Sequence, residues 1–438
     1  MVKHYKISFL LLAWLLCYLT VSAHDFEVNG IYYKINGNEV TVTYCGSSYD
    51  YTDEYSGSVS IPTTVSYNGT SYSVTAIGDE AFRSCSSLTS LSISNTIKSI
   101  GSFAFAKTGL TTLTIPNSVL EIKNNAFGAC TSLTSVVLPS SITKIYNETF
   151  YNCTKLASVS IPNSVLSIGD DAFYNCDGLN SITIPSSVTD IDGNPFRGCF
   201  NLTSIIVQSG NPVYDSRNSC NAIIKTEDNT LISGCTTTLI PNTVTSIGSF
   251  AFAGSGLTTL TIPNSVLEIK NNAFGACTSL TSVVLPSSIT KIYYQTFYNC
   301  TNLASISIPN SVFSIGDKAF YNCDGLNSII IPSTVTDIGG NPFESCSNLT
   351  SISVQSGNTV YDSRNNCNAI IKTESNTLIS GCATTLIPNT VTSIGSFAFA
   401  GTSLSTVTIP NSVLEIKNNA FGGCTSLTSI VLPSSILR

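Results

Sequence analysis

The chain carries a hydrophobic pattern that returns about every 23 residues. Residues 179–184 show it as L-N-S-I-T-I, apolar at the first, fourth and sixth positions. The last four residues alternate polar and apolar, which predicts a short strand with one buried face. Pro185 ends the strand because proline has no N–H group to donate. Val188 and Ile191 then predict a second short extended segment in the same unit.

A phenylalanine marks each unit, and a second, longer period lies above the first. Phe105, Phe252 and Phe399 occupy equivalent places in three similar blocks, so the chain repeats a block of repeats. Two long gaps without a marker separate the blocks. The thirteen marker residues are Phe82, Phe105, Phe127, Phe150, Phe173, Phe196, Phe252, Phe274, Phe297, Phe320, Phe343, Phe399 and Phe421.

A single unit is too small to bury its own apolar side chains. Stacked units would share one continuous core, so the period predicts a solenoid with one parallel strand per coil. The stretch Asp170 to Cys176 predicts a single helical turn, capped by Asp and with Phe173 and Cys176 pointing inward. Thirteen coils at a strand spacing of about 4.8 Å would extend roughly 60 Å.

These units resemble the BspA-type leucine-rich repeat family. The family pattern L-x-x-I-x-I-P-x-S-V-x-x-I-G-x-x-A-F-x-x-C is found at residues 156–176 and 303–323. The resemblance implies a leucine-rich repeat solenoid of the β-rich α/β horseshoe type. It also implies a bacterial surface or secreted protein that acts in adhesion or other interactions.

The remaining segments divide the chain further. Residues 1–23 combine basic residues, an apolar run and a small-x-small site, which predicts a cleaved signal peptide and a secreted or surface protein. Residues 24–75 contain Asn-Gly hairpin signals at Asn36 and Asn68 and predict a β cap on the solenoid, residues 76–438. Hairpin islands are expected near 207–239 and 354–386. No later segment is apolar enough to span a membrane.

The sequence stops at Arg438, in the middle of a coil. Two explanations remain open: the sequence is truncated, which is preferred, or a partner chain closes the end. An uncapped coil would permit end-to-end self-association.

Cysteine occurs 16 times, mostly in the third position after the marker phenylalanine. A metal or redox column is one interpretation, but stacked thiols lie along a line, whereas a metal needs ligands converging on one point. A column of small buried side chains is preferred, with no metal and no cofactor. In the islands, the hairpin register places Cys220 opposite Cys235 and Cys367 opposite Cys382. Disulfides there are as well supported as free thiols.

Composition narrows the chemistry. Charged residues are 10% of the chain and the formal net charge is -7, so the basic surface of a nucleic-acid binder is missing. The two histidines, His4 and His24, both precede the repeats. No nucleophile or nucleotide-binding motif is found, so we expect no enzyme.

The outward residues of the predicted strands are the candidate binding surface. One outward position is Ser or Thr in every coil, and the other varies. A solvated sheet that only favours β structure is one explanation; a long, flat contact surface is the other. Its candidate residues are Thr112, Thr114, Val137, Ile206, Val284, Ile330 and Val431.

The islands offer a second candidate contact point at Tyr214 and Arg217, with Tyr361 and Arg364 in the next block. Local loop packing is the preferred role for these four residues. Three functions follow for the whole chain: non-catalytic adhesion to host proteins or glycans, a structural spacer without a specific partner, and, least favoured, a carbohydrate-active solenoid.

Overall fold

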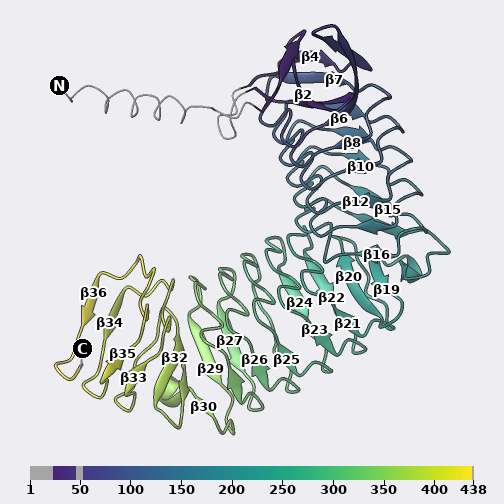
Figure 1. The fold of residues 1–438 in the computed structure, drawn as a ribbon. Helices are drawn as coiled ribbons and strands as arrows, with labels where there is room; N and C mark the ends of the chain where they lie inside the picture. Colours follow the sequence, from purple (N-terminus) through teal and green to yellow (C-terminus); the bar gives the residue numbers. More distant parts are fainter. Residues whose placement is uncertain (1–22, 46–52, 437–438) are drawn as a thin grey trace, which may run out of the picture.

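The computed structural model describes residues 23–45 and 53–436. The predicted signal peptide lies outside these residues except for Ala23. The protein is a β-solenoid of about 15 coils that follow one another in chain order along a curved rod (Figure 1). Parallel strands recur about every 23 residues, which confirms the leucine-rich repeat solenoid.

The first strand of each coil, called the principal strand, has one buried and one exposed face. In β15 and β17 the pairing is parallel, with Ser181 opposite Ser204 and Thr183 opposite Ile206. The principal strands are β4 (Gly57–Ser60), β7 (Leu88–Ser92), β9 (Thr112–Thr114), β11 (Ser135–Val137), β13 (Ser158–Val159), β15 (Ser181–Ile184), β17 (Ser204–Val207), β22 (Thr259–Thr261), β24 (Ser282–Val284), β27 (Ser328–Ile331), β29 (Ser351–Val354), β34 (Thr406–Thr408) and β36 (Ser429–Val431).

A second strand follows in most coils, as Val188 and Ile191 predict, and except for β6 it is two residues long. Its inward isoleucine pairs with the equivalent isoleucine of the next coil, as Ile168 does with Ile191. The second strands are β6 (Thr70–Ile77), β8 (Ser99–Ile100), β10 (Glu121–Ile122), β12 (Lys144–Ile145), β14 (Ser167–Ile168), β16 (Asp190–Ile191), β21 (Ser246–Ile247), β23 (Glu268–Ile269), β25 (Lys291–Ile292), β26 (Ser314–Ile315), β28 (Asp337–Ile338), β33 (Ser393–Ile394) and β35 (Glu415–Ile416).

The N-terminal segment extends the sheet of second strands. It contains β1 (Phe26–Val28), β2 (Ile31–Asn36), β3 (Glu39–Thr43) and β5 (Thr64–Tyr67). Strand β3 pairs in parallel with β6, which pairs in turn with β8. The Asn68-Gly69 turn has positive φ at both residues, as a two-residue type I′ hairpin requires. The other hairpin turns at Gly37-Asn38, one residue later than its Asn-Gly signal.

The predicted helical turn after each second strand is wrong. Asp171 and Asn175 both have φ of 53°, and such left-handed residues interrupt any helix. The segment instead forms tight turns, in which the N–H of Tyr174 donates to the carbonyl of Asp171 at 3.0 Å. Other N–H groups cross to the next coil, as that of Phe150 does to Ala172 at 2.8 Å. The turns therefore add a third hydrogen-bonded column to the solenoid.

The marker phenylalanines and the cysteines fill the core behind these turns. Within a block, rings of successive coils stack closely, as Phe127 and Phe150 do with centroids 5.2 Å apart and Phe150 and Phe173 at 5.3 Å. Every column thiol except that of Cys85 donates to a phenylalanine carbonyl of an earlier coil, as Cys153 does to Phe127 at 3.1 Å. The predictions that Phe173 and Cys176 point inward are both confirmed. The buried thiols also have hydrogen-bond partners.

Each island forms a small antiparallel sheet that joins the second strands. Its elements are β18 (Tyr214–Asp215), η2 (Arg217–Ser219), β19 (Ala222–Lys225) and β20 (Thr230–Gly234) in the first island, and β30 (Tyr361–Asp362), η3 (Arg364–Asn366), β31 (Ala369–Lys372) and β32 (Thr377–Gly381) in the second. Strand β20 then pairs in parallel with β21. The islands are therefore built into the stack rather than appended to it.

The island disulfides are not formed, and the hairpin register explains why. Lys225 faces Thr230, as predicted, but a β-bulge after Ile223 shifts the remaining pairs by one residue. Beyond the bulge, Cys220 packs with the hydrophobic cluster of the middle coils and Cys235 with that of the N-terminal coils. The same bulge recurs between Ile370 and Ile371. All four island cysteines (Cys220, Cys235, Cys367 and Cys382) are buried free thiols.

Candidate functional site

The outward side chains of the principal strands form one surface, here called the strand face. All seven candidate residues lie on it and are exposed. The apolar ones stand well clear of the backbone, with Val137 57%, Val284 60% and Ile330 56% exposed. Across the sheet, each apolar residue faces a small hydroxyl side chain, as Val137 faces Thr114. The outward positions carry no charged residue in any described principal strand.

The strand face is hollowed where neighbouring principal strands separate. One hollow of about 400 Å³ lies between β7 and β9 and is lined by Thr112 and Thr114. A second of about 400 Å³ is lined by Thr259 and Thr261, the equivalent residues of the next block. The same local geometry thus occurs in successive blocks of the solenoid.

The second hollow is lined by an exposed leucine that the sequence analysis missed. Leu239 lines it and is 74% exposed, as is its equivalent Leu386. Its coil packs beside that of Ile206, since the N–H of Thr236 donates to the carbonyl of Leu202 at 3.0 Å. The sequence Leu-Ile-Pro at residues 239–241 matches the end of the strand pattern and could have identified Leu239 as an outward residue. It was missed because this coil lacks the marker phenylalanine.

Ile206, Leu239 and Val284 therefore form an apolar patch over four successive coils, of which the third carries Thr261. The hollow lies between the second and third coils. The patch spans roughly 14 Å at a coil spacing of about 4.8 Å. We call it the central patch. Exposed apolar side chains grouped in this way are typical of interaction sites, whereas single ones are ordinary.

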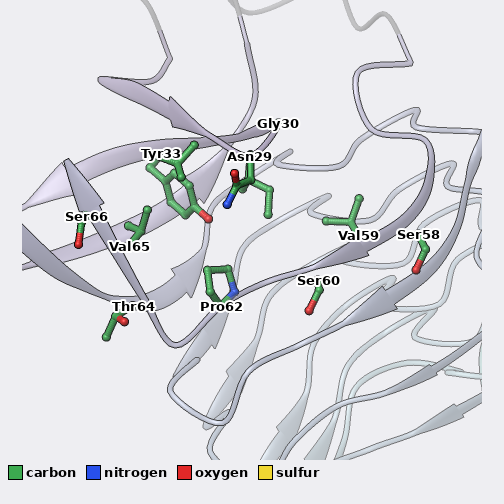
Figure 2. Close-up of a pocket in the computed structure, with 12 residues that line it drawn as sticks. Asn29, Gly30, Tyr33, Ser58, Val59, Ser60, Pro62, Thr64, Val65 and Ser66 are labelled. Atoms are coloured by element: carbon green, nitrogen blue, oxygen red, sulfur yellow. The ribbon is translucent and has the colours of Figure 1, made fainter.

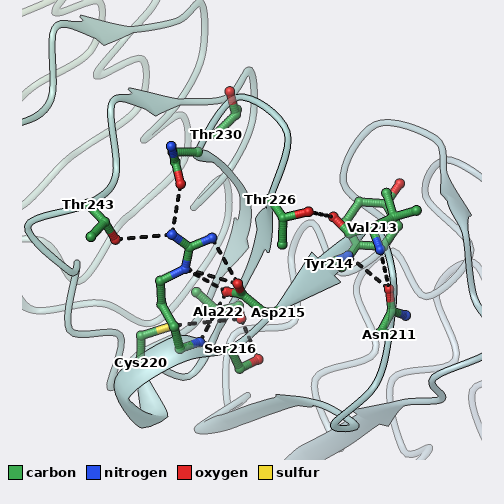
Figure 3. Close-up of polar contacts among 12 residues, drawn as sticks. Asn211, Val213, Tyr214, Asp215, Ser216, Cys220, Ala222, Thr226, Thr230 and Thr243 are labelled. Atoms are coloured by element: carbon green, nitrogen blue, oxygen red, sulfur yellow. Dashed lines mark hydrogen bonds and ion pairs between the residues drawn. The ribbon is translucent and has the colours of Figure 1, made fainter.

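The island residues make local contacts. Tyr214 is 5% exposed, and its hydroxyl accepts a hydrogen bond from the N–H of Ile191 at 3.0 Å. Arg217 binds Asp215 through Nε at 2.8 Å and Asn229 through an Nη at 2.7 Å (Figure 3). Tyr361 and Arg364 repeat these contacts in the second island. These contacts are of the kind that the preferred role of local packing predicts.

A further hollow lies in the cap, with a volume of about 420 Å³. It runs between the β1–β2 turn at Asn29 and strand β4, where Ser58, Val59 and Ser60 follow its wall (Figure 2). Tyr33 and Pro62 contribute to the lining. None of the described residues that line this hollow is charged.

Two partly buried ion pairs explain a difference between the blocks. Asp171 corresponds to Lys318, and Arg197 to Glu344, so the charges are reversed. The structure pairs them: Arg197 contacts Asp171 at 2.5 Å, and Lys318 contacts Glu344 at 3.4 Å. Burial raises the pKa of Asp171 to about 6, although the neighbouring Arg197 opposes the shift. The reversal therefore preserves a pair.

In both blocks the cation lies between two aromatic rings. The Arg197 guanidinium is 4.8 Å from the Tyr174 centroid and 4.9 Å from that of Phe250. Lys318 lies 5.4 Å from Tyr321 and 5.6 Å from Phe397. The aromatic pair thus selects a cation at this point, whichever coil supplies it.

The column cysteines are held as neutral thiols. Burial raises the pKa of Cys199, Cys277 and Cys346 to about 12, which leaves them as neutral thiols at physiological pH. Among residues 23–45 and 53–436, no group of three or more His, Cys, Asp or Glu side chains is placed to hold a metal ion. Within the same residues, no helix is both long and apolar enough to cross a bilayer.

Comparison with known proteins agrees with this architecture. The family model described as "BspA type Leucine rich repeat region" matches residues 63–164, 143–238, 230–350 and 380–438. The chain belongs to the BspA-type leucine-rich repeat family. A search of curated proteins gives no match.

Two crystal structures are similar over most of their length. One is a leucine-rich cell surface protein from Faecalibacterium prausnitzii, with 28% identity, a TM-score of 0.60, and coverage of 75% of this chain and 94% of that chain. The other is the pneumococcal vaccine antigen PcpA, with 19% identity, a TM-score of 0.56, and coverage of 94% and 99%. The second likeness concerns the fold alone.

Proposed function

We propose that this chain is an exported, non-catalytic adhesion protein that binds a host protein through its strand face. Residues 1–23 would direct export, residues 24–75 would cap the solenoid, and residues 76–438 would present the contact surface. The observation that carries the proposal is the central patch beside a hollow of about 400 Å³. The similar cell surface protein from Faecalibacterium prausnitzii supports a surface location.

The chemistry of the face favours a protein partner. Leu239 and Val284 offer exposed apolar contacts, while Thr259 and Thr261 offer hydroxyl donors and acceptors between them. Protein interfaces combine apolar contacts with about one hydrogen bond per 100–200 Å² of buried area. An uncharged face also avoids the cost of burying unpaired charges on binding.

The test measures binding of the mature chain to purified extracellular-matrix proteins and glycans. Leu239→Lys together with Leu386→Lys places a charge on the strand face in two blocks. The matched control is Leu267→Lys with Leu414→Lys, which changes exposed leucines outside that face by the same charge. We expect the first pair to weaken binding by about tenfold or more and the control to retain it.

Other outcomes distinguish the alternatives. No binding to any matrix protein or glycan would favour the structural spacer. Binding that survives both pairs of substitutions would remove the strand face from the proposal. Hydrolysis of a polysaccharide that is abolished by one Asp→Asn change would instead support the carbohydrate-active alternative.

A further inference from the structure

The residue after each marker phenylalanine forms a column of its own along the turns, with one position per coil. In four coils this position holds tyrosine, and the rings stack in pairs. Tyr151 and Tyr174 lie 4.8 Å apart at an interplanar angle of 9°, and Tyr298 and Tyr321 lie 4.9 Å apart at 9°. The column is therefore a stack of aromatic rings wherever the sequence supplies them.

Beyond Tyr174 the stack continues through Arg197, whose guanidinium lies against the rings of both Tyr174 and Phe250. Between Phe250 and Tyr298 the stack is interrupted. The next two positions are Ala253 and Gly275, which supply no ring. The interruption is a hollow of about 230 Å³ whose lining includes Arg197, Phe250, Ala253, Gly275 and Tyr298.

The spacing of the coils fixes the width of this hollow. Phe250 belongs to the coil of Ala253, and Tyr298 to the second coil after it. Two coil spacings amount to roughly 10 Å, about twice the 4.8 Å step of the strands. One ring inserted above Gly275 would therefore stand about one stacking distance from Phe250 and from Tyr298. Tyr321 supports Tyr298 from behind, so that wall is already ordered.

The lining indicates what kind of ring fits. Its walls are aromatic faces, whose negative π surface attracts the partly positive C–H groups of a sugar ring. Asn272 also lines the hollow and offers its amide to hydroxyls at a ring edge, and Asn175 offers its Oδ1, because its Nδ2 already donates to Asn152 at 2.9 Å. Of the described residues that line the hollow, Arg197 alone is charged, and its charge is neutralised by Asp171. A charged ligand would gain little here.

We propose that this hollow is a binding site for one ring of a neutral saccharide, stacked between Phe250 and Tyr298 over Gly275. The site lies on the turns rather than on the strand face, so it does not depend on the function proposed above. It would give the protein a second, smaller ligand beside its macromolecular partner.

The chain provides a sharp variant for testing this site. Gly275→Tyr would place a ring where the saccharide is expected, and equivalent positions already hold tyrosine at Tyr151 and Tyr298. Tyr298→Ala removes one wall, while Tyr294→Ala removes an exposed tyrosine that does not line the hollow.

The mature chain is titrated with glucose, galactose, mannose, N-acetylglucosamine and their disaccharides, and with indole as an aromatic probe. Binding is followed by saturation-transfer NMR. We expect saturable binding of at least one neutral sugar, weakened about tenfold by Gly275→Tyr and by Tyr298→Ala. Tyr294→Ala should leave the affinity unchanged. Circular dichroism checks folding, and Tyr298→Ala decides the matter should Gly275→Tyr fail to fold.

Three results would overturn the proposal. They are the absence of binding by any sugar tested, sugar binding that neither Gly275→Tyr nor Tyr298→Ala alters, and binding of indole alone. None of them bears on the strand face, since Leu239→Lys tests that surface separately.

Discussion

The reversed ion pairs give a prediction in which the chain provides its own reference. Changing Asp171→Lys alone would place an ammonium beside Arg197, and changing Arg197→Glu alone would place a carboxylate beside Asp171. Making both changes would reproduce the arrangement of Lys318 and Glu344. We expect each single variant to be clearly destabilised and the double variant to be restored.

The structure sets the size of the effect. Two unit charges about 4 Å apart interact by about 4 kcal/mol at an effective dielectric constant of about 20. The side chain of Arg197 is 30% exposed and that of Asp171 13%, so solvent screening reduces this value. We expect each single change to cost about 2 to 3 kcal/mol and the double change about 1 kcal/mol or less.

The assay is a urea titration followed by circular dichroism at about pH 8, where Asp171 is ionised because its pKa lies near 6. The control is Lys318→Asp with Glu344→Arg, which imposes the first arrangement on the second block. Repeating the cycle at pH 4 should shrink the coupling, since the raised pKa leaves Asp171 protonated there. Additive costs in the double variant would refute the view that the pair acts as a unit.

Two further predictions concern the core. Gly234→Ala should lower the free energy of unfolding by about 2 kcal/mol, because an added Cβ would lie 2.2 Å from Phe252 Cε1; Gly275→Ala is the control, with no atom closer than 3.3 Å. An unchanged melting temperature for Gly234→Ala would contradict this close contact. Stability should also fall above about pH 9, since an unfolded thiol ionises there whereas burial raises the pKa of Cys346 to about 12. Urea titrations from pH 8 to 11 compare the free energy of unfolding of Cys346→Thr with that of the unchanged chain. Above pH 9 the variant should lose about 1.4 kcal/mol less per pH unit. An equal dependence of the two free energies on pH would contradict the prediction.

Much of the fold could be predicted because the solenoid is built from local periodicity. The alternation in residues 179–184 determines which side chains face inward, and the same alternation recurs in the other coils of the stack. Val137, Ile206 and Val284 were placed on the exposed face for the same reason. Register between parallel coils follows from the equal spacing of the units.

The missed features depend on contacts between distant residues. A β-bulge after Ile223 shifts the hairpin register so that Cys220 does not face Cys235. No local sequence pattern predicts this bulge. Leu239 escaped notice because its coil lacks the marker phenylalanine. The pairing of Asp171 with Arg197 joins two different coils and becomes visible only once neighbouring turns are stacked. The left-handed residues of the turns replaced an expected helix, since their N–H groups find partners in the next coil.

The central claim is that each coil is stable only through its neighbours. Its most direct test is the melting temperature of nested fragments that share the cap, such as residues 24–116, 24–162 and 24–208, beside the isolated unit 156–178. We predict an unstructured single unit and a melting temperature that rises with each added group of coils, because nearest-neighbour interfaces supply the stability. A single unit that folds alone, or fragments that all melt at one temperature, would contradict the account.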